Sequence, residues 1–239
     1  MYTILVSGAA SGLGRAFLDA FVPRNETTII AIDQQPIDVQ VPNVRPFQID
    51  VSSPESIFAF AKSIADVKIN LFIHSAGIRG LVPAIASAKP DDVAAAETLR
   101  VMDLDTMMNT YQINTAGTFM LLQAMVHNFA PNSDGTPPKV VIMGSRMGSV
   151  GYNTTGAAYA YRASKAALNA VIKSFSIDVP TVIFSVIHPG RVETNLVASR
   201  EEGAIEAEDS VKDMLKIIDK LTTADSGKFY DRFGAPIEW

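Results

Sequence analysis

Short apolar runs alternate with longer stretches of helical pattern through this chain, and this alternation restricts the possible folds more than any other feature. Six runs are rich in β-branched residues and almost continuously apolar, as expected for strands covered on both faces of a sheet: 2–7, 27–33, 44–50, 69–75, 139–145 and 181–189. Helices are predicted at 12–22, 54–65, 104–129, 156–177 and 208–221, and a short last strand near 227–231. Strands that alternate with helices form βαβ units, so the pattern predicts an α/β fold built on a parallel sheet.

The composition agrees with a globular α/β protein and argues against some partners. The chain has 239 residues, of which 48% are hydrophobic and 19% charged, which is enough apolar material for a core. The Pro- and Gly-rich stretch 130–139 and the acidic stretch 200–209 are interpreted as loops, so one domain over 1–239 is predicted. A net charge of −5 without a basic block argues against nucleic acid and against an anionic membrane surface as partners.

Cysteine and histidine content limits the possible chemistry. The chain has no cysteine, which excludes disulfides, thiolate catalysis and cysteine metal sites. The three histidines, His74, His127 and His188, lack the spacing of metal ligands. No metal site is therefore predicted, and each histidine is interpreted as a core residue. No apolar run approaches about 18 residues and no basic segment marks the amino end, so a cytoplasmic protein without a membrane span is expected.

A glycine-rich loop follows the first predicted strand. In "SGAASGLGR", Gly8, Gly12 and Gly14 lie between that strand and the first predicted helix. Glycines at this position allow a tight turn and a close approach of the backbone to a pyrophosphate, while the helix N-terminus offers N–H donors. The spacing G-x-x-x-G-x-G differs from the commoner G-x-G-x-x-G, but its position after the first strand indicates a dinucleotide site.

Acidic residues at the ends of the second and third predicted strands indicate which groups of a dinucleotide the site would recognise. Asp33 can accept hydrogen bonds from both hydroxyls of an adenosine ribose, and it repels a 2′-phosphate. No Arg or Lys precedes Gly12 in the loop, and none directly follows Asp33. NAD(H) is therefore preferred over NADP(H) as the expected cofactor. Asp50 can accept from an adenine amino group.

The stretch "YRASK" places a tyrosine and a lysine one helical turn apart. Tyr161 and Lys165 are four positions apart in a predicted helix and so share a face. A nearby cation favours the phenolate and lowers a tyrosine pKa that starts near 10, which suits a proton donor and acceptor at neutral pH. By itself the pair is also compatible with an ordinary helix surface, so the interpretation depends on the rest of the chain.

Together these motifs resemble the short-chain dehydrogenase/reductase family over essentially the whole chain. The segments "YAYRASKAALN", "HPGRVETNL" and "FGAPIEW" are most similar to the small carbonyl-reductase branch that includes the sniffer and C-factor proteins. The resemblance implies an α/β, Rossmann-like, doubly wound single domain, in which helices flank both faces of a seven-stranded, mostly parallel sheet. It also implies a homodimer or homotetramer formed through helices 104–129 and 156–177.

The resemblance assigns four catalytic roles. Tyr161 takes the place of the acid/base tyrosine, and Lys165 that of its partner, which also holds the nicotinamide ribose. Ser145 takes the place of the catalytic serine, and Asn114 that of the asparagine that supports a proton-relay water. Tyr159 lies close by, but no lysine follows it at the fourth position. Taken singly, Ser145 and Asn114 are also ordinary strand-end and helix residues, so the combination carries the interpretation.

The resemblance also assigns the cofactor contacts. They lie in the glycine loop, after the second, third and fourth strands, in the catalytic pair and in the loop over the nicotinamide: Ser7, Gly8, Ser11, Gly12, Leu13, Gly14, Asp33, Asp50, Val51, Ser75, Ala76, Gly77, Tyr161, Lys165, Pro189, Gly190, Val192 and Thr194.

Two positions depart from the family pattern. Ser7 stands where threonine is usual, and "HSAG", from His74 to Gly77, replaces Asn-Asn-Ala-Gly. Cofactor binding is expected to survive, because Ser7 keeps the hydroxyl and Ser75 keeps some hydrogen-bonding capacity.

The expected function is an NAD(P)(H)-dependent oxidoreductase that interconverts a secondary alcohol and a carbonyl, with Tyr161 as general acid and base. Two alternatives stay open, a catalytically silent nucleotide-binding sensor or scaffold and a non-redox enzyme on the same fold. The substrate pocket is expected to be walled by 78–104, 146–156 and 191–207. These ranges include Arg146, Met147, Tyr152, Arg191 and Leu196, and the two arginines favour an anionic substrate unless they point to solvent.

Overall fold

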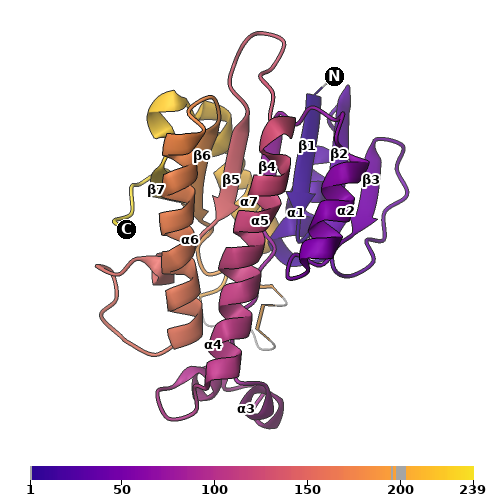
Figure 1. Ribbon diagram of the computed structural model, residues 1–239. Coiled ribbons are helices and arrows are strands. Elements are labelled where there is room, and N and C mark those ends of the chain that lie inside the picture. The colour runs from indigo at the N-terminus through magenta and orange to yellow at the C-terminus, as the bar shows by residue number, and fades with distance from the viewer. Residues whose placement is uncertain (1, 195, 198–202) are drawn as a thin grey trace.

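The computed structural model describes residues 2–194, 196–197 and 203–239. Its centre is a seven-stranded sheet in the order β3-β2-β1-β4-β5-β6-β7 (Figure 1). The strands are β1 (Tyr2–Ser7), β2 (Thr27–Asp33), β3 (Val44–Gln48), β4 (Leu71–His74), β5 (Lys139–Met143), β6 (Ile183–His188) and β7 (Lys228–Asp231). Every pairing in this sheet is parallel, so the predicted α/β fold is confirmed, and the sheet is wholly rather than mostly parallel.

Helices cover both faces of the sheet, as the doubly wound fold requires. They are α1 (Gly12–Phe21), α2 (Pro54–Ser63), α3 (Pro83–Ala88), α4 (Leu104–Tyr111), α5 (Thr118–Met125), α6 (Tyr159–Asp178) and α7 (Ala207–Lys220). Figure 1 shows α2, α5 and α6 in front of the sheet, with α1 and α7 behind it.

Two hydrophobic cores result from the alternation of side chains along each strand. Ile4 and Val6 of β1 point to the face of α1 and α7, where they pack with residues such as Phe17 and Met214. Leu5, between them, points to the opposite face, in the core that α2, α5 and α6 cover. Because both faces are covered, the inner strands carry apolar side chains at nearly every position. The prediction of 44–50 as a buried strand was wrong in this respect, because β3 lies at the edge of the sheet and exposes Arg45, Pro46 and Gln48. Burial of each large side chain contributes about 1.5–3 kcal/mol.

The predicted helix 104–129 is divided in the structure. α4 is followed by a π-helical segment, Gln112–Gly117, before α5 begins, and a short 3₁₀ turn, Val126–Asn128, follows α5. The hydroxyl of Thr118 donates to the Asn114 carbonyl at 2.9 Å, which is the kind of side-chain bond that perturbs a helix locally. Gly117 lies where a Cβ would come within 2.3 Å of the Val51 carbonyl oxygen, so the helix passes directly against that backbone.

The predicted helix 156–177 begins later than expected. Gly156, Ala157 and Ala158 have φ angles of +69°, +54° and +49°, which belong to left-handed backbone and cannot start a right-handed helix. α6 therefore starts at Tyr159 and continues to Asp178. Two short helical segments, α3 and the 3₁₀ turn Val93–Glu97, were not predicted, because each is too short to show a period.

The three histidines do not share one environment. His74 is buried and His188 mostly so, whereas His127 is exposed near the end of α5, so its interpretation as a core residue was wrong. His127 lies in the 3₁₀ turn Val126–Asn128 that follows α5, where its side chain faces outward while the next residue, Asn128, is buried.

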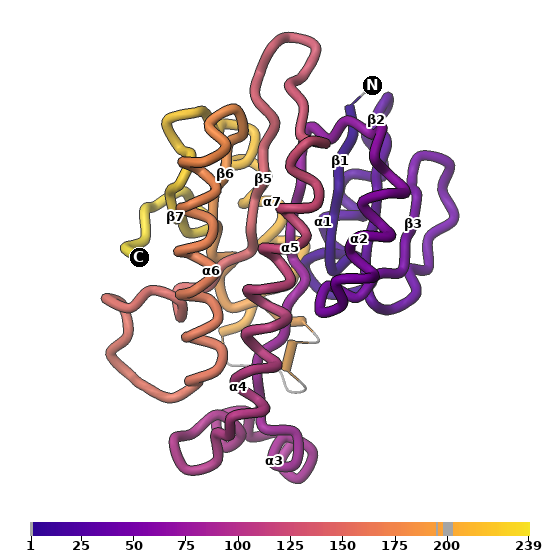
Figure 2. Tube along the Cα trace, in the orientation of Figure 1, coloured from indigo at the N-terminus to yellow at the C-terminus, as the bar shows by residue number. Residues whose placement is uncertain are grey.

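Different segments lie at the amino and carboxyl ends of the strands. Figure 2 shows the N-terminus and the loop 130–138 at one end and α3 at the other. The strands run toward the α3 end, so their carboxyl ends gather there. The strand order reverses between β1 and β4, and ligands of open parallel sheets bind at such a point. Among the described residues, no helix is both long and apolar enough to cross a membrane.

Candidate active site

A cleft of about 900 Å³ lies at the carboxyl ends of the strands. It contains every predicted site residue except Gly14 and Asn114, which lie behind its wall. Ile78, Arg79, Thr154 and Thr155 line the cleft from the predicted pocket walls 78–104 and 146–156. The cleft also contains residues that the sequence did not predict: Ile32, Gln34, Gln35, Ile49, Ile113, Met143, Gly144, Arg162, His188, Asp231, Arg232 and Phe233. The cleft therefore brings together residues from all parts of the chain.

The glycine loop forms one wall of this cleft with no room for side chains. Gly8 has φ +69°, and a Cβ there would lie 2.9 Å from the Ala76 nitrogen. A Cβ on Gly14 would lie 2.1 Å from the Gly8 carbonyl oxygen, which explains a glycine at a position outside the cleft itself. Ser11 precedes α1 without a side-chain cap, so the first N–H groups of the helix are left for a ligand. This cradle fits a pyrophosphate.

The carboxylates at the ends of β2 and β3 are held by backbone groups. Asp33 Oδ2 accepts from the Ala10 nitrogen at 3.0 Å and Oδ1 from the Gln35 nitrogen at 2.8 Å. Asp50 Oδ1 accepts from the backbone nitrogen and the hydroxyl of Ser52. Both carboxylates are thus fixed in the cleft, where they can meet a ribose and a purine.

The segment that departs from the family pattern is tied to β1 by hydrogen bonds to Ser7. Ser7 Oγ accepts from the backbone nitrogens of Ser75, at 3.1 Å, and Ala76, at 3.2 Å. The ring of His74 lies 2.8 Å from Ser7 Oγ through Nδ1, and it is buried under the cleft floor. The replacement of asparagine by His74 and Ser75 therefore leaves the floor intact.

Tyr161 and Lys165 share one face of α6, as their spacing predicts. Both are buried, and Lys165 Nζ lies 5.8 Å from the centroid of the Tyr161 ring. Nζ donates to the Met143 carbonyl at 2.9 Å, which anchors it at the end of β5. Burial lowers the pKa of Lys165 from 10.5 to about 8.

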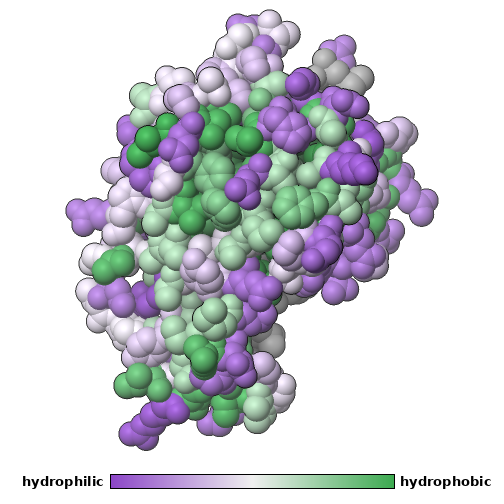
Figure 3. Space-filling view, in the orientation of Figure 1, coloured by the Kyte–Doolittle hydropathy of each residue, from purple (hydrophilic) through white to green (hydrophobic). Residues whose placement is uncertain are grey.

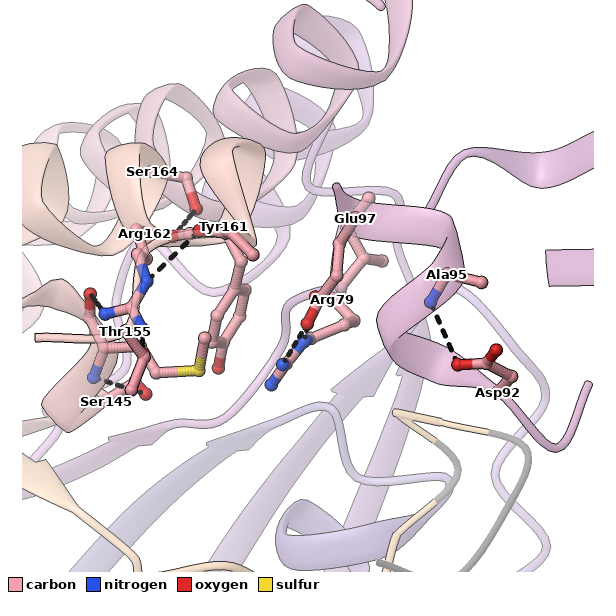
Figure 4. A network of polar contacts seen from close by, with 12 residues as sticks. Arg79, Asp92, Ala95, Glu97, Ser145, Thr155, Tyr161, Arg162 and Ser164 are labelled. Carbon is pink, nitrogen blue, oxygen red and sulfur yellow. Dashed lines mark hydrogen bonds and ion pairs between the residues drawn. The ribbon is translucent and has the colours of Figure 1, made fainter. Parts of the chain in front are cut away.

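Arg79, from the predicted pocket wall 78–104, lies on the other side of the tyrosine, a contact that the sequence did not predict. The Arg79 guanidinium is 5.0 Å from the centroid of the Tyr161 ring, and it forms a bidentate pair with Glu97 at 2.9 Å for both bonds. Figure 4 shows the Tyr161 ring between this pair and the side of the cleft that carries Ser145. No local motif marks Arg79, because its partner is 18 positions away in an unpredicted turn.

Ser145 and Asn114 occupy different depths. Ser145 follows β5 in the cleft wall, where its Oγ accepts from the Met147 nitrogen at 3.2 Å and keeps its hydrogen for another acceptor. Asn114 is buried in the π-helical segment. Its Nδ2 donates to the Ile78 carbonyl and to Ser164 Oγ, and its Oδ1 accepts from the Ile78 nitrogen. The Asn114 side chain thus ties the loop after β4 to α6.

The loop after β6 folds over the glycine loop. Gly190 has φ +92°, and a Cβ on Gly12 would come within 3.1 Å of Thr194 Cβ. Pro189 is held from α7, because its carbonyl accepts from Ser210 Oγ at 2.7 Å. Part of the predicted pocket wall 191–207 and of the acidic stretch 200–209 lies outside the described residues.

The end of the cleft beyond Ser145 is rich in arginine. The Arg146 guanidinium lies 4.9 Å from the centroid of the Tyr152 ring and 3.8 Å from Asp231 Oδ2. Arg232 is also in this wall, 3.7 Å from Asp213. Burial and, to a smaller extent, the positive charge of Arg146 lower the pKa of the neighbouring His188 to about 4, so its imidazole is neutral at neutral pH.

Burial of Lys165 should make the free energy of unfolding of the cofactor-free protein increase as the pH rises through the alkaline range. Between pH 8 and 10.5 the unfolded chain binds a proton at this lysine that the folded chain has lost, so the free energy of unfolding rises with pH there. Urea unfolding should show a rise of a few kcal/mol in wild type that Lys165→Met lacks. Lys173→Met, an exposed lysine of the same helix, should keep the rise. Equal curves for the two variants would contradict the burial of the Lys165 charge.

Comparisons with known proteins agree with this arrangement. A family model described as short chain dehydrogenase matches residues 2–204. The chain is 34% identical to the C-signal protein of Myxococcus xanthus over 76% of this chain and 99% of that protein. It is 32% identical to 1-hydroxy-2-glutathionyl-2-methyl-3-butene dehydrogenase of Rhodococcus sp. (strain AD45), over 100% of both chains.

Solved structures show the same fold. The NADPH-bound carbonyl reductase from chicken fatty liver superposes with a TM-score of 0.82 at 26% identity, over 100% of this chain and 99% of that one. The carbonyl reductase Sniffer of D. melanogaster superposes equally, with a TM-score of 0.82, at 24% identity and over 100% of both chains. With its parallel sheet, its glycine loop and a matching family model, the chain belongs to the short-chain dehydrogenase family.

Proposed function

We propose that this protein is an NAD(P)(H)-dependent oxidoreductase that interconverts a secondary alcohol and a carbonyl. One observation carries the proposal: Tyr161, Lys165 and Ser145 line the same cleft as the glycine loop. The glycine positions leave no room for side chains, which fits a dinucleotide laid across them. We treat 1–239 as one domain that both binds the cofactor and carries the chemistry.

The described residues suit acid–base chemistry at a carbonyl oxygen. When bound, the nicotinamide supplies or accepts the hydride. In the reductive direction Tyr161 donates a proton to the oxygen, and in the oxidative direction it removes one from the alcohol. Ser145 donates a hydrogen bond to the same oxygen as charge develops on it. Lys165 favours the phenolate, and Asn114 holds the backbone of Ile78 and α6 in register.

A titration followed by an activity screen tests this function. Binding of NADH or NADPH is followed by fluorescence, and then a panel of alcohols and ketones is assayed by absorbance of the reduced nicotinamide. Turnover of any member supports the proposal. Binding without turnover of the panel favours the nucleotide-binding sensor, and binding of neither cofactor favours a non-redox enzyme.

We further propose a preference for NAD(H), carried by Asp33. Its carboxylate lies in the cleft at the end of β2, fixed by the backbone nitrogens of Ala10 and Gln35, and there it would repel a 2′-phosphate. The carbonyl reductase from chicken fatty liver was solved with bound NADPH, and a short-chain dehydrogenase/reductase from Burkholderia multivorans with bound NADP. The proposed preference of this chain for NAD(H) therefore rests on Asp33 alone.

Asp33→Ala should therefore shift the preference toward the phosphorylated cofactor. The dissociation constant for NADH should rise about tenfold and that for NADPH should fall by a similar factor. Asp50→Ala is the matched control, since it removes the other fixed carboxylate of the cleft and should change both constants by the same factor. A wild type that binds NADPH more tightly would mean that the end of β2 has been misread.

An anionic group on the substrate is the class that the arginine-rich end fits best. Within the described residues the Arg146 guanidinium forms no hydrogen bond, and its buried Nε has no partner. It directly follows Ser145 in the chain. The relative from Rhodococcus is named for a glutathionyl compound, which carries carboxylates. We propose that Arg146 receives a carboxylate, and that Arg191 and Arg232 add positive potential around it.

Matched ketone pairs, a free acid beside its methyl ester, test this recognition. Wild type should favour the acid in kcat/KM, and Arg146→Gln should reduce that preference about tenfold through KM. Arg24→Gln, an arginine outside the cleft, should leave it unchanged. Equal turnover of acid and ester by wild type would reject the carboxylate while leaving the oxidoreductase proposal intact.

An apolar face is available for contact between copies. Met108 and Tyr111 of α4, Phe119 of α5, and Tyr159 and Ile177 of α6 are all exposed. Figure 3 shows hydrophobic side chains gathered over this side of the molecule. The face is the candidate for the predicted homodimer or homotetramer contact.

A further inference from the structure

A buried chain of hydrogen bonds runs through His74, beneath the proposed catalytic residues. His74 lies at the end of β4 and is 2% exposed. Its Nδ1 is 2.8 Å from Ser7 Oγ, and its Nε2 is 2.8 Å from Thr118 Oγ1. Ser7 is 67 positions and Thr118 is 44 positions away in the chain, so the ring connects β1 to the start of α5 across the sheet.

The neighbours of the ring determine where its proton lies. Thr118 Oγ1 donates its only hydrogen to the Asn114 carbonyl at 2.9 Å, so it must accept from His74 Nε2–H. Ser7 Oγ already accepts from two backbone nitrogens, those of Ser75 and Ala76, and its own hydrogen is left for Nδ1. The network therefore assigns the neutral tautomer that is protonated on Nε2. Along it Ser7 Oγ donates to Nδ1, Nε2 donates to Thr118 Oγ1, and Thr118 Oγ1 donates to the Asn114 carbonyl.

The surroundings oppose a second proton on this ring. Burial and, to a smaller extent, the positive charge of Lys165 lower the pKa of His74 to about 3. A protonated Nδ1 would also point its hydrogen at Ser7 Oγ. That oxygen already accepts hydrogen bonds from two backbone nitrogens, so it has no lone pair left for a third donor. The ring is thus a fixed connector and not a group that titrates near neutral pH.

We propose that His74 is a positioning residue that fixes the distance between the start of the glycine loop, at Ser7, and the Asn114 carbonyl. At one end Ser7 adjoins Gly8, whose backbone faces the cleft. At the other end Asn114 binds Ile78 and Ser164, and Ser164 lies on the helix that carries Tyr161 and Lys165. This inference rests on the proposed function, because it assigns the connection a purpose in cofactor binding and acid–base chemistry.

An imidazole can make this connection and a shorter amide cannot. Its two nitrogens lie on opposite sides of a rigid ring, so both ends are held by one side chain with two rotatable bonds. An asparagine amide reaches about as far as Nδ1, and a glutamine amide about as far as Nε2. His74→Asn therefore keeps the Ser7 bond alone, and His74→Gln keeps the Thr118 bond alone.

Double-mutant cycles between the two ends test the connection. Ser7→Ala and Thr118→Val are made singly and together, in wild type and in the His74→Asn and His74→Gln backgrounds, and the NADH dissociation constant is measured by fluorescence. Ser7 and Thr118 do not bond to each other, so coupling between them must pass through the ring. In wild type the two effects should depart from additivity by a factor of about three to ten. In either His74 background they should be additive.

A matched control separates this coupling from general loosening. Thr115→Val removes another buried threonine of the π-helical segment, whose Oγ1 donates to the Ser164 carbonyl at 2.8 Å and does not reach His74. Its effect should be additive with Ser7→Ala. Thermal unfolding of each variant shows which backgrounds fold, and one folded background suffices for the comparison.

A spectroscopic measurement needs no cofactor at all. Nitrogen-15 NMR of the three histidines should show one, assigned through its loss in His74→Asn, that carries its proton on Nε2 and does not titrate between about pH 5 and 8. A ring that titrates in that range, or that carries the proton on Nδ1, would overturn the inference. So would additive effects in wild type. A wild type that binds neither NADH nor NADPH would instead reject the proposed function, and the NMR result would still decide on the connection.

Discussion

The Tyr161→Phe variant should bind the nicotinamide cofactor nearly as tightly as wild type and turn over its substrate about 10²–10⁴-fold more slowly. In the proposed mechanism the phenol oxygen exchanges a proton with the substrate, while in the variant the ring keeps its packing between Lys165 and Arg79. Removal of the oxygen therefore deletes the acid–base step and little else. The expected signature is a large fall in kcat with a small change in the cofactor dissociation constant.

Tyr159→Phe supplies the matched comparison for this variant. Tyr159 lies two residues earlier on the same helix, is partly exposed and is absent from the lining of the cleft. Its loss of a hydroxyl should leave kcat within a factor of about two or three. Steady-state kinetics with one accepted substrate measures both variants. Similar losses in the two would show that Tyr161 is not the acid–base group.

Ser145→Ala is the second large effect, with kcat expected to fall by about two to three orders of magnitude. The Ser145 hydroxyl accepts from the Met147 nitrogen, which orients it and leaves its hydrogen for the substrate oxygen. A hydrogen bond that strengthens as charge develops stabilises the transition state more than the ground state, so KM should change little. Single-turnover measurements separate this step from product release.

Ser149→Ala is the control for the serine. Ser149 is also buried and its Oγ accepts from the Tyr152 nitrogen, but it does not line the cleft. Its removal should alter stability slightly and leave the chemical step nearly unchanged. Unchanged turnover in Ser145→Ala would remove this residue from the mechanism.

The inner strands could be predicted from the sequence because each is covered on both faces of the sheet. Near-continuous apolar runs such as "TTIIAID" are required by that environment, and β2 has the predicted bounds, Thr27–Asp33. Helix boundaries were less predictable. The π-helical segment inside 104–129 and the late start of α6 depend on a side-chain bond and on left-handed backbone, neither of which disturbs the apolar period.

The candidate site was predictable where its signals are local. The glycine loop lies within one turn between a strand and a helix, and Tyr161 and Lys165 are neighbours through helix geometry alone. Arg79 beside Tyr161, and Asp231 beside Arg146, are contacts between distant segments. No periodicity or spacing encodes such a contact, so these pairings could be found only in the folded chain.

The chain's residue order was sufficient to predict the parallel α/β architecture, the glycine loop between β1 and α1, and the tyrosine–lysine pair. Each of these follows from interactions within a few residues or from burial on both faces of a strand. The tertiary structure decided which charges meet around Tyr161, which residues line the far end of the cleft, and which groups His74 contacts. His74 looked like a departure from a motif, yet its ring nitrogens contact Ser7 and Thr118, which only the sheet and the packing of α5 bring together. A hydrogen bond needs two groups within about 3 Å, and that proximity is a property of the fold and not of the local sequence.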